Sequence, residues 1–562
     1  MNKIAVVYMR KLELEPETYE SKFTELAKGT NIKVQNWILE RIKAPQIILE
    51  VGCGTGTLAK KMALNGNQVL AIDKNLQMID TAMKNFPSEP NTKLLYQIGS
   101  ITDLPAEDNS KDLIVSTFML SELRPLEQQN FLRNAWKVLK PNGRMILAAE
   151  FVPSGIWKIL FNIKRWKYKK KLRRLRLPST FVVKWFFNYL EPIGFKLMAE
   201  KKWNHGSIRV IELKKIQNDN LKEPGYYRPK PKKFKGIRAQ MNIYRCIFTG
   251  QVDHIPIEPG IYKSGSPDMN SPILVTANYI YTYIKLMRAL KGIDAWVLCV
   301  DSNGINVWCA ARGNNFGNKQ LIEVVEATDI ADVSNKKTLI LPQLSAGGVA
   351  SPLIKSEAPN FKYNILFGPV WAKDIPKFLN ERPTRKPDKM KLAKFTASHR
   401  LRAAITHTTF LLRKIFFWPS IVLILIFLGL NMASIIDVNK LLFIGEIWLW
   451  VIITNISIMI LFPLTNFTRK FITKGIIYGV INVFLLSYIS WLFHTSLLLI
   501  FWQSFFYFWL AFFSTMSYSG YTMATSPREI QDEYPTFSKI NMILLIIGII
   551  TLATGFILPL IF

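Results

Sequence analysis

The chain has 562 residues, a formal net charge of +32 and a hydrophobic content of 49%. The hydrophobic content excludes an intrinsically disordered protein, and the length predicts about three domains. Residues 415–562 hold only six basic and five acidic side chains, so +31 of the charge lies in the first 414 residues. Charge and apolar content thus belong to different regions, and the apolar tail excludes a purely soluble enzyme.

A glycine-rich turn follows the first predicted strand. The apolar residues 47–49 lead into Glu50-Val51-Gly52-Cys53-Gly54-Thr55-Gly56 and a helical stretch, and a second apolar run, Val69–Ile72, ends at Asp73. Glycines let the backbone approach a ligand closely, and an acid after the next strand can accept both ribose hydroxyls of a nucleoside. Because the spacing from Gly56 to Asp73 is near the roughly 20 residues of a dinucleotide fold, NAD is an alternative ligand at this point.

This turn resembles motif I of class I S-adenosylmethionine (SAM)-dependent methyltransferases more closely than the G-x-G-x-x-G of dehydrogenases. Asp112–Val115 resembles the central strand of that family, and Leu139–Leu147 resembles its late L-K-P-G-G turn and strand. The resemblance covers about residues 20–213 and implies a Rossmann-like α/β domain, with the glycine loop at the methionine part of SAM and Asp73 at the ribose.

The loop that usually carries an acid beside the adenine reads Gly99-Ser100-Ile101 here, so backbone groups or Asp103 would bind the adenine. A nucleotide-binding fold without activity is the alternative to a working methyltransferase. The SAM-binding residues that the resemblance implies are Glu50, Gly52, Gly54, Gly56, Asp73, Ser100 and Ile101.

Basic residues cluster between Lys164 and Arg176, where nine of thirteen side chains are Lys or Arg, with Trp166 and Tyr168 among them. Basic and aromatic side chains suit RNA, whereas a basic patch beside the cytoplasmic leaflet attracts anionic lipid by about 1 kcal/mol per residue. The membrane tail favours lipid over RNA, with a solvated face as a third interpretation, and no nucleic-acid partner is expected. A second basic stretch, residues 224–238, is rich in proline and predicts a semi-rigid linker.

The middle of the chain predicts a second α/β domain. Pro272–Thr276 and Ala295–Val300 are typical of strands, and a helix is predicted between them at Tyr281–Leu290. A small-residue loop with one cysteine, Cys309, then precedes a helix predicted over Phe316–Ala327. This cysteine could be a nucleophile or a metal ligand, since a helix N-terminus favours a thiolate, although a lone buried cysteine is usually inert.

Asn306-Val307-Trp308-Cys309-Ala310-Ala311 resembles the cap-helix motif of the HgcA family, the membrane-bound corrinoid proteins of mercury methylation. That family is related to the corrinoid iron–sulfur protein of acetyl-CoA metabolism. The resemblance covers about residues 250–562, including a five-span tail. The flanking segments that resemble the family in the same order are Ser271–Tyr279, Asp294–Leu298, Leu339–Leu344, Phe367–Val370 and Asp374–Pro376.

The resemblance implies that Cys309 is the lower axial ligand of the cobalt in a corrinoid of the cobalamin type. It also implies that Thr276 and Asn278 lie near the corrin and that the loop Leu341–Gly348 lies near its nucleotide tail. A thiolate ligand donates electron density to the metal, which favours loss of the methyl group as a carbanion equivalent to Hg²⁺. The other implied corrinoid-binding residues are Asn306, Val307, Trp308, Ala310 and Ala311. The chain departs from the family pattern at Arg312–Asn315 and Ser345–Gly348.

The tail predicts five transmembrane helices, because a bilayer core of about 30 Å needs about 20 apolar residues per helix. Basic residues before the first span, between the second and third, and between the fourth and fifth fall on one side, which predicts cytoplasmic N-terminal domains and an outer C-terminus. Glu446 in the second span is either a functional group or a snorkelling or protonated structural one. The five predicted spans are Ile415–Ile436, Leu441–Thr465, Gly475–Phe493, Leu497–Met516 and Ile540–Phe562.

No charged segment followed by an apolar one opens the chain, so no signal peptide is predicted. The four cysteines, Cys53, Cys246, Cys299 and Cys309, form no C-x-x-C pair. No zinc or iron–sulfur site and no disulfides are therefore predicted in this cytoplasmic setting, and the electron donor must be a separate protein, for example a ferredoxin-like one.

We therefore predict a multi-pass protein of the cytoplasmic membrane. Its predicted parts are a SAM-dependent methyltransferase domain (1–215), a basic linker (216–249), a corrinoid-binding domain (250–395), a basic juxtamembrane segment (396–414) and five transmembrane helices (415–562). The hypothesis is methyl transfer from SAM to the corrinoid and on to a small-molecule or metal-ion acceptor such as Hg²⁺, with membrane lipids as further partners. The alternatives are a SAM methyltransferase of a lipid, quinone or other small molecule, and a corrinoid carrier charged by another enzyme.

Overall fold

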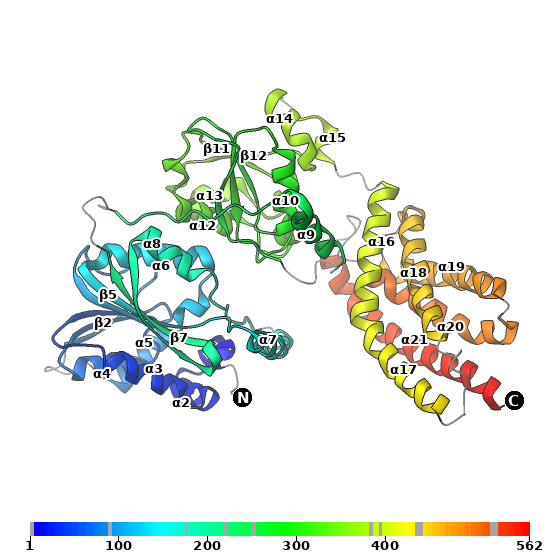
Figure 1. The fold of residues 1–562 in the computed structure, drawn as a ribbon, viewed down its shortest axis with the longest axis horizontal. Coiled ribbons are helices and arrows are strands. Elements are labelled where there is room, and N and C mark those ends of the chain that lie inside the picture. Colours follow the sequence, from blue (N-terminus) through cyan, green and yellow to red (C-terminus); the bar gives the residue numbers. More distant parts are fainter. Residues whose placement is uncertain are drawn as a thin grey trace. The chain divides into compact units, whose positions relative to one another are not determined.

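The computed structural model describes residues 5–87, 93–175, 177–216, 223–248, 255–381, 386–392, 396–432, 442–468, 470–493, 495–517 and 527–561. The chain divides into two units (Figure 1). The first unit comprises Met1–Lys232, Pro256–Asn278 and Leu290–Gly368. The second comprises Lys233–Ile255, Tyr279–Ala289 and Pro369–Phe562.

A seven-stranded sheet with the order β3-β2-β1-β4-β5-β7-β6 organises the N-terminal part of the first unit (Figure 1). The strands β1 to β5 pair in parallel, whereas β7 pairs antiparallel with both β5 and β6. This confirms the predicted Rossmann-like domain, and its order reverses between β1 and β4, where open α/β sheets bind ligands. The strands are β1 (Ile47–Val51), β2 (Gln68–Asp73), β3 (Leu94–Ile98), β4 (Lys111–Thr117), β5 (Leu139–Glu150), β6 (Phe195–Trp203) and β7 (Ile208–Lys215).

Two hydrophobic cores cover the two faces of this sheet. Successive strand side chains point to opposite faces, so Ile48 packs in the core that contains helices α2 to α4, whereas Leu49 packs in the core that contains α6 and α8. The next residue, Glu50, is a buried acid at the end of an apolar strand. The helices are α1 (Met9–Leu12), α2 (Pro16–Ala27), α3 (Thr30–Leu39), α4 (Thr57–Leu64), α5 (Leu76–Asn85), α6 (Pro125–Val138), α7 (Ile156–Arg174) and α8 (Phe186–Ile193).

A five-stranded sheet with the order β12-β11-β9-β10-β8 forms the middle of the chain. Only β8 runs antiparallel to its neighbour, so this is the second α/β domain that the sequence predicts. The strands are β8 (Gly260–Ser264), β9 (Ile273–Ala277), β10 (Ala295–Val300), β11 (Thr338–Leu341) and β12 (Asn364–Phe367). The helices of this region are α10 (Ile280–Ala289), α11 (Val307–Arg312), α12 (Asn318–Thr328), α13 (Ser351–Glu357), α14 (Ile375–Glu381) and α15 (Asp388–Lys391).

Two local features of the middle region differ from the predictions. Cys309 does not lie in a loop but in the short helix α11, and the predicted helix after it begins two residues later, as α12. The stretch predicted as a linker ends in helix α9 (Gly236–Phe248). The apolar residues Ala239, Ile243 and Cys246 of α9 are buried at helical spacing. The linker prediction was based on proline-rich composition and did not use this spacing.

Four helices of the second unit are long and apolar enough to cross a membrane, at Leu442–Thr465, Phe471–Leu492, Leu497–Thr515 and Pro535–Thr554. They correspond to four of the five predicted spans. The first predicted span contains α17 (Phe417–Met432), a shorter apolar helix. The last four positions of this predicted span, 433–436, lie outside the described residues. A fifth span therefore stays a prediction. The helices of this tail are α16 (Ala397–Leu411), α17, α18 (Leu442–Leu461), α19 (Phe471–Leu492), α20 (Leu497–Ser517) and α21 (Pro527–Ile561).

Candidate functional site

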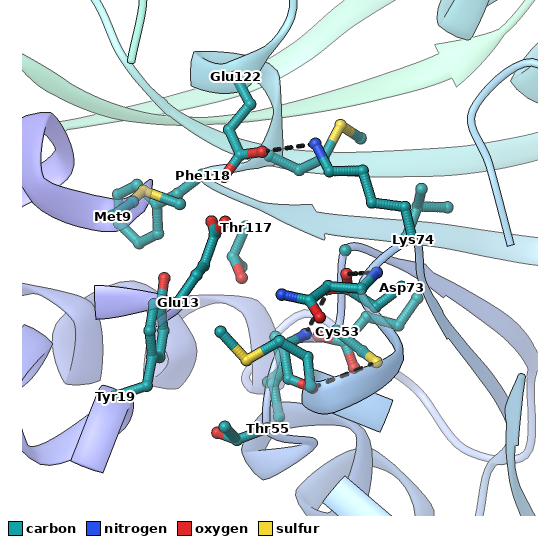
Figure 2. Close-up of a pocket in the computed structure, with 18 of the residues that line it drawn as sticks. Met9, Glu13, Tyr19, Cys53, Thr55, Asp73, Lys74, Thr117, Phe118 and Glu122 are labelled. Carbon is teal, nitrogen blue, oxygen red and sulfur yellow. Dashed lines mark hydrogen bonds and ion pairs between the residues drawn. The ribbon is translucent and has the colours of Figure 1, made fainter. Parts of the chain in front are cut away.

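A pocket opens at the carboxyl ends of β1 and β2, beside the glycine turn (Figure 2). Its walls come from the turn, from the start of the chain and from the segment after β4. Met9, Glu13 and Tyr19 lie on one side, and Asp73 and Lys74 lie on the other (Figure 2). The pocket thus occupies the position at which this sheet order predicts a ligand.

Asp73 holds the glycine turn in place through two backbone hydrogen bonds. Its Oδ2 accepts from the Gly54 N–H at 3.0 Å, and its Oδ1 accepts from the Asn75 N–H at 2.9 Å. Burial raises the pKa of Asp73, and these two N–H groups act in the opposite direction. Each carboxylate oxygen retains a lone pair for another donor, so the two ribose hydroxyls of a nucleoside remain compatible with this arrangement.

Glycine is required where the turn enters helix α4. Gly56 has a φ of +79°, and a Cβ added there would come within 2.7 Å of the Tyr96 hydroxyl oxygen and 3.0 Å of the Ala82 Cβ. A residue with a side chain would be strained at this φ and would also collide with its neighbours. Gly56 therefore allows the turn to pack closely against Tyr96 and Ala82, and it is not among the residues that line the pocket.

Glu50 supplies the clearest sign that the pocket suits a cationic ligand. Its carboxylate is 1% exposed, and its Oε2 has no hydrogen-bond partner among the described residues. Burial raises the pKa of Glu50 well above its usual range, and the nearby Asp73 adds to the effect. A buried acceptor without a partner is costly. The ammonium group of SAM would satisfy it by donating a hydrogen bond, and the positive charge of the ligand would favour the ionised form of Glu50. The residues present thus fit SAM.

A second pair of carboxyl groups, Glu13 and Glu122, lies at the side of the pocket away from the glycine turn (Figure 2). The Glu122 carboxylate forms an ion pair with Lys74 at 2.9 Å, and it accepts a hydrogen bond from Glu13. Burial and this bond raise the pKa of Glu13 to about 8, whereas the bond from Glu13 and the charge of Lys74 lower the pKa of Glu122 despite its burial. These shifts favour the proton on Glu13 and the negative charge on Glu122.

The second candidate site is the thiol of Cys309. Asn306 caps α11 by accepting from the Cys309 N–H at 2.9 Å, and the Asn306 side-chain amide lies 3.4 Å from the Cys309 sulfur. The sulfur is half-buried, and burial raises the pKa of the thiol, while Asn306 and Arg312 lower it. Val307, Ala310 and Ala311 are buried and fix the helix, so that the side chains of Trp308 and Cys309 stay partly accessible.

Asn278 organises the loop that leads into α11. Its Oδ1 accepts from the N–H and hydroxyl of Ser302 and from the Gly304 N–H, and its Nδ2 donates to the Ile257 carbonyl and to Asp301. The Asn278 side chain is fully buried, and these bonds use both of its donors. Thr276 is likewise 1% exposed. The loop before α11 is thus fixed by the hydrogen bonds of Asn278.

The surroundings of Cys309 fit a metal that brings its other ligands with it. Within the described ranges, no group of three or more His, Cys, Asp or Glu side chains could hold a metal ion. The single soft thiol of Cys309 would be a suitable donor for the cobalt of a corrinoid, which brings its other ligands in its ring. Small residues also surround α11: a Cβ at Gly348 would lie 2.7 Å from the Ala311 carbonyl oxygen, whereas Gly347 faces open space.

Comparison with known proteins assigns the two regions separately. Residues 49–147 match the family described as methyltransferase domain. Residues 233–351 match the family described as CO dehydrogenase/acetyl-CoA synthase delta subunit. The chain therefore joins a SAM-dependent methyltransferase domain to a corrinoid-protein-like domain of the delta-subunit type. The narrower resemblance to the HgcA family stays a prediction.

Similar curated proteins are subunits gamma of the acetyl-CoA decarbonylase/synthase complex. The protein from Methanopyrus kandleri is 31% identical over 140 residues, which cover 24% of this chain and 29% of that one. The protein from Methanocaldococcus jannaschii is 30% identical over 108 residues, or 19% and 22% of the two chains. The chain thus spans less than a third of the length of these relatives. Among solved structures, a SAM-dependent methyltransferase from Methanosarcina mazei is 21% identical and covers 32% of this chain and 98% of its own, with a TM-score of 0.28.

Most of the predicted SAM-binding residues of the methyltransferase domain come together in one pocket. Glu50, Gly52, Gly54 and Asp73 line it beside the loop Gly99–Ile101, which was predicted to lie near the adenine. Asp103 is not among the lining residues; its backbone forms an isolated bridge with Ser100.

The sequence prediction missed the wall formed by the start of the chain, including Met9, Glu13 and Tyr19. These residues precede the region of resemblance and form no motif. The only available signal was a run of acidic side chains near the start of a strongly basic chain: Glu13, Glu15, Glu17, Glu20 and Glu25.

Proposed function

We propose that this chain is a membrane-anchored, corrinoid-dependent methyltransferase. In this proposal a methyl group passes from SAM to the cobalt of a corrinoid held by Cys309, and then to an acceptor such as Hg²⁺. One observation carries the proposal: a single chain contains an acid-lined pocket that fits SAM and a partly accessible thiol, Cys309, in a domain similar to a delta subunit.

The residues of the chain have distinct tasks in this proposal. Asp73 orders the glycine turn and accepts the ribose hydroxyls, while Glu50 receives a cationic group of SAM. The amide of Asn306 stabilises the thiolate of Cys309, and the network around Asn278 fixes the loop before it. When bound, the corrinoid supplies a cobalt that takes up a methyl group and gives it to an electrophile.

The fusion and the membrane tail account for the arrangement of the parts. Joining the two domains makes the transfer intramolecular, which raises the effective concentration to about the millimolar range for a short linker. The proposal places both domains on the cytoplasmic side of the inner membrane, with the C-terminus outside. It also requires a separate electron donor, such as a ferredoxin-like protein, because no C-x-x-C pair is present for a cluster.

Isotope transfer tests the proposal directly. The purified chain in detergent, reconstituted with cobalamin under reducing conditions, is given SAM labelled in the methyl group. We expect label in the corrinoid fraction for the native chain, less label for Asp73→Asn at the same SAM concentration, and almost none for Cys309→Ala. If the native chain binds both SAM and cobalamin but transfers no label, the relay is wrong.

A second candidate function rests on Glu13. Its pKa of about 8 makes the ionised form of Glu13 a minor one at neutral pH, but a stronger base than an ordinary carboxylate. This form can accept a proton from an N–H or O–H methyl acceptor beside the SAM pocket. The methyltransferase domain would then act on a small molecule, lipid or quinone independently of Cys309. Consumption of SAM by the Cys309→Ala variant in a membrane extract, together with its loss in Glu13→Gln, would favour this function over the relay.

A further inference from the structure

Helix α7 (labelled in Figure 1) carries an apolar face that the methyltransferase domain does not cover. Six large apolar side chains on it are 38% to 69% exposed. Trp157 stacks on His205 of the domain, and the other five are Ile156, Ile159, Leu160, Ile163 and Trp166. Each residue of a helix advances about 100° around its axis, so these five side chains form one continuous face. A face of this size needs an explanation, because soluble domains rarely expose contiguous apolar patches.

The opposite face of α7 is fixed to the domain. Phe161, Arg165 and Leu172 are buried, and these positions lie about 180° from the exposed apolar face. Arg165 forms a buried ion pair with Glu150 at the end of β5, and its guanidinium also donates to the Thr180 hydroxyl at 3.2 Å. The exposed face is therefore held outward by the fold, and α7 cannot turn it inward without breaking this ion pair.

Lysines accompany the exposed face. At about 100° per residue, Lys167 continues the apolar face toward the C-terminal end of α7 and Lys171 lies at its edge, whereas Lys158 lies more than about 90° from its centre; all three are exposed. Residues 156–174 contain no acidic side chain at all. An exposed apolar stripe on a helix with exposed lysines and no acidic side chain is typical of helices that lie in the interface of an anionic bilayer. The same chain has four helices that are long and apolar enough to cross a bilayer, which favours a membrane as the partner of this face.

We propose that α7 is a membrane-surface helix that inserts the face Ile156–Trp166 into an anionic leaflet and thereby holds the methyltransferase domain against the bilayer. This differs from contact through the basic run 164–176 alone, because the inserted residues begin eight positions earlier and are apolar. It also removes Arg165 from the set of lipid-facing basic residues, since its guanidinium is buried. The proposal is independent of whether the methyl group passes to a corrinoid.

Photocrosslinking of the full chain in nanodiscs tests the proposal. The photoreactive residue benzoylphenylalanine replaces Ile163 in one protein and Leu95, an exposed residue of the same domain, in the other. The nanodiscs contain either phosphatidylcholine alone or phosphatidylcholine mixed with phosphatidylglycerol. We expect lipid adducts at residue 163 to exceed those at residue 95 by more than about tenfold in the anionic discs.

A matched pair of variants, both carrying benzoylphenylalanine at residue 163, tests whether the lysines of α7 cause the preference for anionic lipid. Lys158→Gln/Lys167→Gln/Lys171→Gln should remove the excess of adducts in anionic over neutral discs. Lys137→Gln/Lys196→Gln/Lys201→Gln, which changes three exposed lysines elsewhere on the domain, should retain it. SAM binding by each protein verifies that the domain is folded. Adducts to protein instead of lipid at residue 163, equal yields at residues 163 and 95, or equal yields in the two kinds of disc would overturn the proposal.

Discussion

The SAM pocket and the Cys309 site would recognise the ligands of the proposed function in opposite ways. The pocket is lined by many polar groups, among them Glu13, Glu50, Asp73 and Glu122, and within the described part of the chain the buried Oε2 of Glu50 has no hydrogen-bond partner. The Cys309 site offers one donor atom on a six-residue helix, and the polar residues behind it already bond to each other. Single substitutions should therefore weaken the first site by degrees, whereas at the second site one substitution should remove the function.

Replacing Cys309 should have the largest effect. Cys309→Ala removes the single soft donor of the site, so we expect corrinoid-dependent methyl transfer to fall by more than about 100-fold, beyond the loss typical of supporting residues. SAM affinity should not change. The visible spectrum of the cobalamin-reconstituted protein and calorimetric titration with SAM measure the two sites separately. Cys246→Ala, at a buried cysteine of α9, is the control. An unaltered corrinoid spectrum in Cys309→Ala would contradict the assignment of the ligand.

Replacing Asp73 should weaken SAM binding without abolishing the fold. Asp73→Asn removes the charge that accepts the Gly54 and Asn75 N–H groups, and hydrogen bonds to charged groups contribute about 1.5–3 kcal/mol. We expect the Kd for SAM to rise about 10- to 100-fold, as measured by calorimetry. Asp103→Asn, near the pocket but not lining it, should change the Kd little. An equal effect of both variants would show that local charge and not the hydrogen bonds of Asp73 determines affinity.

The two sites also differ in how far the sequence could predict them. The glycine turn was predictable because its positions are required by backbone conformation, as the collision of a Cβ at Gly56 with Tyr96 demonstrates. The wall containing Glu13 was not predictable, because its role depends on packing between the start of the chain and Glu122, far away in the sequence. The helical state of Cys309 was missed because α11 is too short to produce a periodic apolar pattern, and its cap at Asn306 is its main determinant.

The membrane tail shows the same limit. Apolar length alone predicted four helices that the structure contains, since a run of about 20 apolar residues has few alternatives. Composition could not predict how these helices join. The Asn482 side chain accepts from the Thr454 hydroxyl at 3.0 Å and donates to the Tyr507 carbonyl at 2.7 Å, which links α18, α19 and α20. Such polar contacts depend on helix orientation, which is set by packing.

The carboxyl pair of the SAM pocket should make binding pH-dependent. Glu13 has a pKa of about 8 in the folded chain against an ordinary value of 4.5. Between these values the folded chain holds a proton that the unfolded chain has lost, so the stability contributed by Glu13 falls as the pH rises through this window. A cationic ligand favours ionised Glu13, so SAM affinity should rise with pH toward about 8 and then level off.

Titration with SAM on both sides of pH 8 measures this dependence. We expect affinity to increase by up to about tenfold per pH unit below the pKa, the limit for release of one proton. Glu13→Gln should flatten the profile, whereas Glu17→Gln, an exposed neighbour in α2, should preserve it. A native profile that is already flat would mean that Glu13 keeps its proton when SAM binds.

The smallest expected effect is at Asn306, which acts on the Cys309 thiol without replacing it. Asn306→Asp keeps an oxygen that can accept from the Cys309 N–H but removes the amide beside the sulfur and adds a negative charge. Both changes disfavour the thiolate, so its pKa should rise by about half to one pH unit. The rate of Cys309 alkylation by iodoacetamide against pH, followed by mass spectrometry, measures this, and the other three cysteines are buried. Asn315→Ala, a nearby amide bonded to Gly313, is the control. If the pKa does not rise in Asn306→Asp, burial alone sets the pKa of the Cys309 thiol. The site would then depend on its one sulfur atom without help from Asn306, in contrast to the pocket with its many polar groups.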